Sequence, residues 1–125
     1  MIRTAIVFLF IFLAGMTHGV RDSILFKYSQ TDLKPAQFWN PAESWRNKYK
    51  DYPIDKSPKF IGAKTFLVAL TDGSHLLVFI ETAFFMIAVL IGDFKRCRFR
   101  YLVLLFFAFK VLYGGGSELM MYLIL

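Results

Sequence analysis

The sequence predicts an all-α fold, an integral membrane bundle of about three transmembrane helices with a short interfacial helix in the first loop. Of its 125 residues, 57% are hydrophobic and 18% are aromatic, and the mean hydropathy is +0.51. Such a chain has too little polar surface to cover its own core, so lipid must cover part of it. The apolar residues gather in long runs, and the chain length favours a single membrane domain, residues 1–125.

The net charge of +6 suits contact with a lipid bilayer that carries anionic headgroups. No Lys- and Arg-rich run with interleaved aromatic residues predicts a nucleic-acid groove, so we expect no nucleic-acid partner. A homo-oligomer or a membrane-protein partner is left open. The single cysteine, Cys97, excludes an internal disulfide. Its neighbouring cations favour a lowered pKa of the thiol, as in reactive cysteines. We nevertheless expect an incidental or palmitoylated thiol beside the membrane.

The first apolar run predicts a transmembrane helix over about residues 4–25. A cleaved signal peptide would look similar, with small residues at Thr17 and Gly19 near its end. The run is long for a signal peptide, and we expect the segment to be retained. Gly15 and Gly19 form a Gly-x-x-x-Gly pair, which would let another helix approach closely.

The polar segment over residues 26–59 is predicted to be a loop on the headgroup region of the membrane. Aromatic residues beside lysines at the density seen here are typical of a membrane interface. Asn40 stands as a helix cap, Pro41 at the first helical position and Glu43 at the third. This pattern predicts a short interfacial helix from Pro41 to about Lys50.

Three residues of the same loop, Trp45, Arg46 and Lys48, are candidate headgroup-binding residues. Their rings and cations would bind a phosphate-bearing headgroup or cover a site beneath the loop. The alternative is an interfacial anchor without specific binding, which the composition fits just as well.

The second apolar run, residues 60–92, is longer than one membrane crossing. As a single helix it would be about 50 Å long, against about 30 Å of hydrocarbon. A turn at Thr71–Ser74 would divide it into two crossings, but the first of these would be too short to span. We therefore predict one helix over about residues 62–92, whose first turns, with Lys64, stand in the interface.

The remaining chain predicts a basic loop over residues 93–100 and a third transmembrane helix over about residues 101–125. Gly114–Gly116 inside this helix indicates a kink or a close helix contact. The basic loop favours a cytoplasmic position for itself and for the N-terminus, whereas the cations of residues 21–59 favour the opposite orientation. The expected location is a multi-pass protein of a bacterial inner membrane.

Charged residues inside the predicted helices each cost at least about 2.5–3.5 kcal/mol on insertion, so each calls for a partner or a purpose. The residues noted are His18, Asp22, Asp72, His75, Glu81, Lys110 and Glu118. At 1.5 Å per residue, Glu81 and Lys110 reach nearly the same layer of the second and third helices. We predict that these two residues form a structural ion pair.

The other candidates form two couples, each on one helix face. His18 and Asp22 are four residues apart, and Asp72 and His75 are three apart. In an up-down-up bundle both couples would lie in the outer half of the membrane. Glu81 points away from Asp72, which predicts that the second helix lies in the middle of the bundle. We expect a cluster of two histidines and two carboxylates near the outer surface.

This cluster suggests a divalent metal site in which all four residues are ligands, because facing helices hold zinc, iron or manganese with such side chains. Asp72 and His75 are also the catalytic candidates. A metal there would activate water against a lipid ester, a phosphoester or a peptide bond. Haem between the two histidines is disfavoured, because carboxylates beside a haem ligand would be unusual. The chain would then be a metal-dependent membrane hydrolase.

The alternative is a non-enzymatic protein in which the cluster only holds helices together. It would be a membrane interaction subunit or a holin-like small membrane protein of the phage type. Proton or ion passage along the polar residues is a third interpretation. The sequence leaves open whether the chain is an enzyme.

Four short segments together resemble a pattern in small uncharacterised membrane proteins of Bacteroidetes-type bacteria and their phages. They are His18 with Asp22, Phe38-Trp39, Ser44-Trp45-Arg46-Asn47-Lys48-Tyr49 and Thr71-Asp72-Gly73-Ser74-His75. The resemblance covers roughly residues 15–80 and does not extend to the third helix. It implies no activity, and it suggests that these polar positions act together.

Overall fold

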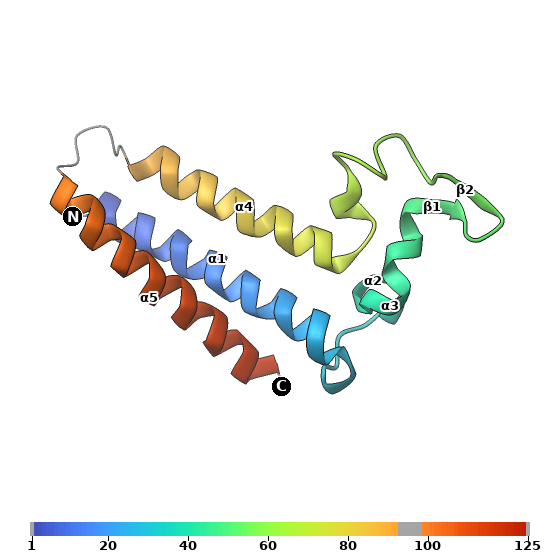
Figure 1. Ribbon diagram of the computed structural model, residues 1–125, viewed down its shortest axis with the longest axis horizontal. Coiled ribbons are helices and arrows are strands. Elements are labelled where there is room, and N and C mark those ends of the chain that lie inside the picture. The colour runs from blue at the N-terminus through green and yellow to red at the C-terminus, as the bar shows by residue number, and fades with distance from the viewer. Residues whose placement is uncertain (1, 93–98, 125) are drawn as a thin grey trace.

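The computed structural model describes residues 2–92 and 99–124. Most of these residues belong to three long helices, α1 (Ile2–Lys27), α4 (Gly73–Gly92) and α5 (Phe99–Ile124). The helices run up, down and up, and α1 lies between α4 and α5 (Figure 1). An all-α fold was predicted, and the described chain is mostly helical with one short pair of antiparallel strands. The predicted basic loop and Cys97 fall largely outside the described residues.

Two helices of the described chain are long and apolar enough to cross a membrane. They lie within Ile2–Gln30 and Gly73–Gly92. Many of the side chains that point away from the bundle are also apolar. Examples that are at least 60% exposed are Phe79, Met86 and Leu90 on α4, and Val111, Tyr122 and Leu123 on α5. An apolar surface of this extent is typical of contact with lipid or with another protein.

Glycines let α1 and α5 approach to backbone contact. A Cβ added to Gly15 would lie 2.0 Å from the carbonyl oxygen of Tyr113, and one added to Gly19 would lie 2.1 Å from that of Ser117. Gly116 of α5 meets the backbone of α1 in the same way. The close approach predicted from the Gly-x-x-x-Gly pair is therefore confirmed, and α5 continues as a helix through its three glycines.

The apolar core lies towards the N-terminal half of α1. Val7 and Ile11 of α1 are buried against Ala88 of α4. Aromatic rings close the space between α4 and α5, where Phe85 stacks on Phe109 with ring centroids 5.4 Å apart. Burial of these side chains is what joins three segments that are far apart in the sequence.

The prediction of one helix over residues 62–92 is wrong for its first part. Gly62 has a φ of +85°, which a right-handed helix does not contain, and the following residues form turns and a short 3-10 helix, η3 (Val68–Leu70). The regular helix starts at Gly73 because Asp72 caps it: the backbone N–H of His75 donates to Asp72 Oδ1 at 2.9 Å. Asp72 thus begins α4 and does not lie inside it.

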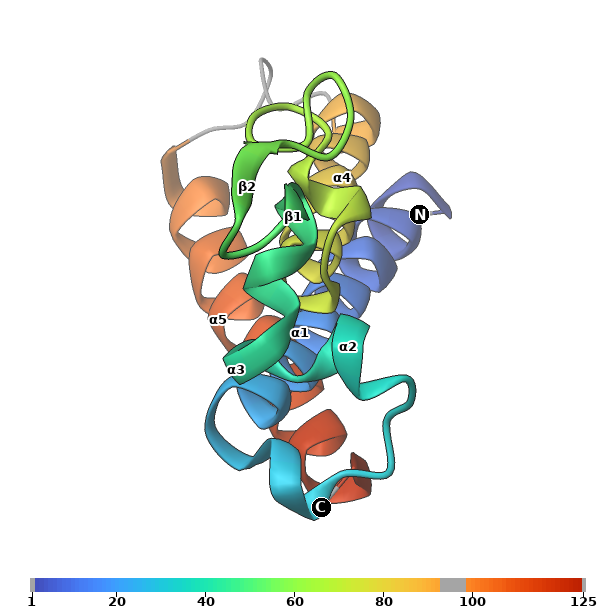
Figure 2. The ribbon, with the colours of Figure 1, turned by 90° about the vertical axis from the view of Figure 1, so that its right-hand side faces the viewer.

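The segment between α1 and α4 lies at one end of the bundle (Figures 1 and 2). Its elements are η1 (Tyr28–Gln30), α2 (Ala36–Trp39), α3 (Pro41–Ser44), η2 (Trp45–Lys48), and an antiparallel pair of strands, β1 (Tyr49–Asp51) and β2 (Asp55–Pro58). Asn40 caps α3 by accepting a hydrogen bond from Ala42 N at 3.1 Å. The helix predicted to reach about Lys50 ends sooner, because the chain tightens into η2 and then extends as β1.

Candidate functional site

A carboxylate on α4 joins all three helices. Glu81, whose side chain is only 13% exposed, accepts a hydrogen bond from Arg21 Nη1 of α1 at 3.2 Å. Its other oxygen, Oε1, accepts one from the Tyr113 hydroxyl of α5 at 2.5 Å. The buried charge is therefore paired with a cation and satisfied by a second donor.

His18 and Asp22 extend this network along α1. Arg21 Nη2 lies 2.9 Å from His18 Nδ1. Because a guanidinium only donates, Nδ1 acts as the acceptor and the neutral ring carries its proton on Nε2. That nitrogen faces Asp22 Oδ2 at 3.3 Å. The five residues His18, Arg21, Asp22, Glu81 and Tyr113 form one connected unit, called the three-helix network below.

The predicted Glu81–Lys110 ion pair is not what the structure contains. Lys110 is exposed on α5, and among the described residues the cation paired with Glu81 is Arg21. The prediction placed α4 in the middle of the bundle, whereas α1 occupies that position and supplies the cation. Arg21 could have been found, since it is a cation one turn after His18 at the depth of Glu81. Tyr113 gave no comparable indication.

Asp72 and His75 form a separate couple at the start of α4. Asp72 is 2% exposed, and its two oxygens lie 2.9 and 2.8 Å from His75 Nδ1. A carboxylate is an acceptor, so Nδ1 carries the proton and Nε2 is left with a free lone pair. The His75 side chain is 49% exposed. A buried carboxylate thus orients a half-exposed imidazole, an arrangement known from general bases.

The structure does not unite the predicted four-residue cluster. Each couple is in contact internally, but His18 contacts Glu81, which lies more than two turns along α4 from Asp72, roughly 13 Å at 1.5 Å per residue. Among residues 2–92 and 99–124, no three His, Cys, Asp or Glu side chains converge as a metal site requires. The cause is the late start of α4, which moves Asp72 and His75 to the end of the bundle.

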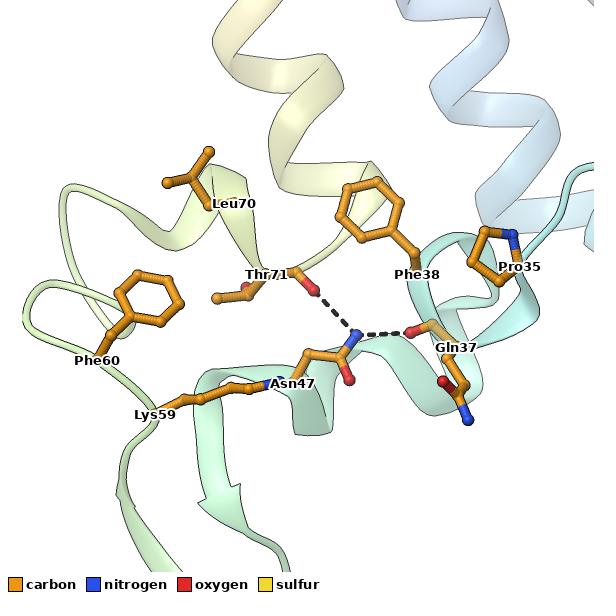
Figure 3. Close-up of a pocket in the computed structure, with 8 residues that line it drawn as sticks. All are labelled: Pro35, Gln37, Phe38, Asn47, Lys59, Phe60, Leu70 and Thr71. Carbon is orange, nitrogen blue, oxygen red and sulfur yellow. Dashed lines mark hydrogen bonds between the residues drawn. The ribbon is translucent and has the colours of Figure 1, made fainter.

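The connecting segment is fastened beside this couple. The side-chain amide of Asn47 donates to the carbonyl oxygens of Gln37 at 2.6 Å and Thr71 at 3.0 Å (Figure 3). The Thr71 hydroxyl lies 3.3 Å from Asp72 Oδ2. The ring of Trp39 covers Gly73, where an added Cβ would lie 2.1 Å from a ring carbon. Trp39, Asn47 and Thr71 therefore gather around the start of α4.

A pocket of about 250 Å³ opens next to Thr71. Figure 3 shows its lining, which is Pro35, Gln37, Phe38, Asn47, Lys59, Phe60, Leu70 and Thr71. Half of the lining residues are apolar, and the polar half is Gln37, Asn47, Lys59 and Thr71. Such a lining suits a molecule that is partly apolar and carries a polar or anionic group.

The candidate headgroup residues belong to an aromatic and cationic surface on the same segment. Trp45 and Tyr52 contact each other with ring centroids 4.8 Å apart. The Arg46 guanidinium lies 5.5 Å from the Trp45 ring centroid, and Lys48 lies 5.6 Å from that of Tyr49. These cations rest on ring faces, which holds them in place at the end of the bundle.

Comparison with known proteins adds no identification. No protein-family model matches the sequence, and no curated protein or solved structure matches the chain. The chemistry of the two polar sites therefore carries the functional proposal.

Proposed function

We propose that the chain is an integral membrane protein in which α1, α4 and α5 all cross the bilayer. Support comes from the inverted distribution of polarity: apart from Lys110 and Glu118 on α5, the outward faces of α4 and α5 are mostly apolar, while the charges of the three-helix network are turned inward. Lipid favours this arrangement and water disfavours it. Resistance of the full chain to alkaline carbonate extraction, with the two terminal tags of one and the same molecule on opposite sides of the membrane, would test the three crossings.

The function we propose for this membrane protein is hydrolysis at the lipid–water boundary, with His75 as general base. The observation that carries it is the Asp72–His75 couple, in which a buried carboxylate holds Nδ1 and leaves Nε2 free on the exposed side. A helix cap alone would need only the bond from His75 N to Asp72 Oδ1. The additional contact with the imidazole is what a base requires.

In the proposed reaction His75 Nε2 takes a proton from a water molecule as the water oxygen attacks the carbon or phosphorus of an ester. Asp72 stabilises the resulting imidazolium. The same nitrogen then returns the proton to the leaving alkoxide, which completes the cleavage. The neighbouring pocket with Lys59 would hold the partly apolar substrate, which makes a lipid ester or phosphoester the best-fitting class.

The sequence suggested a zinc, iron or manganese ion, and the described residues do not fit one. The four proposed ligands are divided between two places, and no third ligand approaches the couple of Asp72 and His75. A metal centre requires at least three protein ligands in most catalytic sites. The proposed reaction therefore proceeds through the imidazole and no step depends on a metal.

The test is hydrolysis of a mixed lipid extract by the full chain in nanodiscs, followed by mass spectrometry of the released products. We expect wild-type turnover to fall by about 100-fold or more in His75→Ala. Asp72→Asn should lose most of the activity while keeping the helix cap, because asparagine caps as well as aspartate. Metal content should not change between wild type and His75→Ala. Equal turnover in both proteins would exclude the proposed reaction.

The second candidate is a non-enzymatic membrane subunit or holin-like protein. The observation that favours it is the three-helix network, in which the largely buried Glu81 carboxylate accepts hydrogen bonds from both α1 and α5, as expected of a contact that holds helices together. In that case no lipid would be cleaved, and His75→Ala would change neither assembly nor lipid composition. Conductance of liposomes containing the chain would identify a pore.

We also propose that Trp45, Arg46 and Lys48 bind anionic headgroups. Support comes from their place at one end of the bundle and from the cations resting on aromatic rings. Nanodiscs with phosphatidylglycerol should therefore shift the Trp fluorescence of the chain further to the blue than nanodiscs with phosphatidylcholine. Arg46→Gln with Lys48→Gln should remove that difference, whereas Lys34→Gln with Lys50→Gln serves as the charge-matched control.

A further inference from the structure

The outward face of α5 carries two charges that the bundle does not use. Lys110 and Glu118 are both exposed, and within the described residues neither takes part in an ion pair. Between them lie Val111, which is 73% exposed, and Gly114, where an added Cβ would meet nothing within 4 Å. The face is thus apolar with one cation and one anion.

Exposure of Lys110 to lipid would be energetically unfavourable because of its depth in the membrane. Tyr113 is level with Glu81 because the two are hydrogen-bonded, and Glu81 lies in the middle part of α4 (Gly73–Gly92). Lys110 is less than one turn from Tyr113, so in the proposed three-span arrangement it lies near the centre of the membrane. A cation that faces lipid at that depth is strongly disfavoured. An opposite charge on a neighbouring helix would remove the penalty.

We propose that a second copy of this chain covers the face, packed antiparallel to the first about Gly114. Lys110 and Glu118 stand about one turn on either side of Gly114. In an antiparallel pair that crosses there, Lys110 of each copy lies opposite Glu118 of the other, so two ion pairs form at once. A parallel pair would place Lys110 beside Lys110. Gly114 would let the two backbones approach closely.

This arrangement rests on the proposed membrane embedding and requires that the chain inserts in both orientations. The distribution of cations in the sequence permits it, because Lys and Arg occur at both ends of the bundle. Arg3 lies in the first turn of α1, and the segment at the other end of the bundle has the cations of residues 26–72. In the sequence, Lys95, Arg96, Arg98 and Arg100 belong to the loop predicted between the second and third helices. With cations on both sides, the charge bias that fixes orientation is weak.

Cross-linking in native membranes tests the geometry, with Cys97→Ser as the background. We expect Gly114→Cys to cross-link with itself, and a Lys110→Cys chain to cross-link with a co-expressed Glu118→Cys chain. Thr82→Cys, on the exposed side of α4, is the control that should not cross-link. Self-cross-linking of Lys110→Cys would show a parallel pair and overturn the proposal.

Charge reversal tests the pairing independently. Lys110→Glu and Glu118→Lys should each lower the dimer fraction in single-molecule photobleaching at least fivefold, and the double variant should restore it. A wild-type chain that resists carbonate extraction but is monomeric would overturn the dimer alone. A chain that carbonate extracts would overturn the membrane proposal itself, so the two failures are distinguishable.

Discussion

Arg21 of α1 and Glu81 of α4 form an ion pair of 3.2 Å in the interior of the bundle, although 60 positions separate them in the sequence. Tyr113 of α5 donates to the second oxygen of the same carboxylate. Three segments that share no local sequence relationship therefore meet at one side chain. The stability of the bundle should depend on Glu81 more than on any exposed acidic residue.

Glu81→Ala should lower the free energy of unfolding by about 3 kcal/mol, because it removes the more buried partner of Arg21 and leaves only the longer contact with Asp22, at 3.6 Å. Unfolding in mixed detergent micelles measures this change. Asp32→Ala, at an exposed position, should change the stability by less than about 0.5 kcal/mol. Replacing both members, with Arg21→Leu and Glu81→Leu, should recover part of the loss. Equal effects of Glu81→Ala and Asp32→Ala would contradict this assignment.

Gly19→Ala should destabilise the contact between α1 and α5 by about 1–3 kcal/mol, because its Cβ would lie 2.1 Å from the Ser117 carbonyl oxygen. The matched control is Gly115→Ala. An added Cβ there meets nothing within 4 Å, and alanine is the better helix former by about 1 kcal/mol. The two substitutions should thus have opposite signs in the same micelle unfolding experiment; the same sign for both would argue against close packing at Gly19.

Asn47→Ala should loosen the connecting segment without affecting the helices. Its amide donates to Gln37 O and Thr71 O, and the loss of both bonds should cost about 1–3 kcal/mol locally. Hydrogen exchange would then accelerate around residues 35–60 and stay unchanged in α1. Asn40→Ala, which removes the cap of α3, should accelerate exchange only in α3. Uniform protection in both variants would show that Asn47 does not fasten the segment.

Asp72→Ala should cost about 1 kcal/mol through loss of the α4 cap, and Asp72→Asn should cost only a few tenths. Hydrogen exchange of the first turn of α4 reports this difference. The same pair separates structure from chemistry, since Asp72→Asn should retain protection while losing hydrolysis. If hydrolysis survived in Asp72→Asn, the carboxylate would be a cap and nothing more.

The β1–β2 hairpin should weaken at low pH. Hydrogen bonds from Ser57 hold the pKa of the Asp55 carboxyl below its usual range. A lowered folded-state pKa means that the ionised form stabilises the hairpin above the unfolded pKa, and that this contribution disappears as the pH falls through the folded value. Amide protection in the hairpin should therefore be constant from pH 7 to about 4 and decrease below it. Asp55→Asn should remove the pH dependence.

Local features of the fold were predictable because their causes lie within a few residues. Asn40 and Pro41 start α3 where the sequence places a cap and a first-turn proline. Gly15 and Gly19 lie where α5 comes closest. The start of α4 was missed, because the apolar run from residue 60 resembles a longer helix and only the capping bond of Asp72 shows where the regular turns begin.

The candidate site was predictable in its couples but not in their assembly. His18 with Asp22 and Asp72 with His75 are neighbours on one helix turn, and each couple is in contact. Whether the couples meet depends on where Asp72 and His75 lie along the bundle axis. Each residue by which the start of α4 shifts moves them by about 1.5 Å along that axis. The late start at Gly73 keeps them apart.

The sequence by itself determined that the chain has long apolar helices, a polar aromatic segment between the first two, and couples of histidine with aspartate. The tertiary structure alone decided which partner Glu81 takes. That choice depends on which helix lies in the middle. Because all three helices have similarly apolar faces, the sequence permits more than one order of packing. The packing of Gly15 and Gly19 against α5, together with α4 on the other side, places α1 in the centre and brings Arg21 to Glu81.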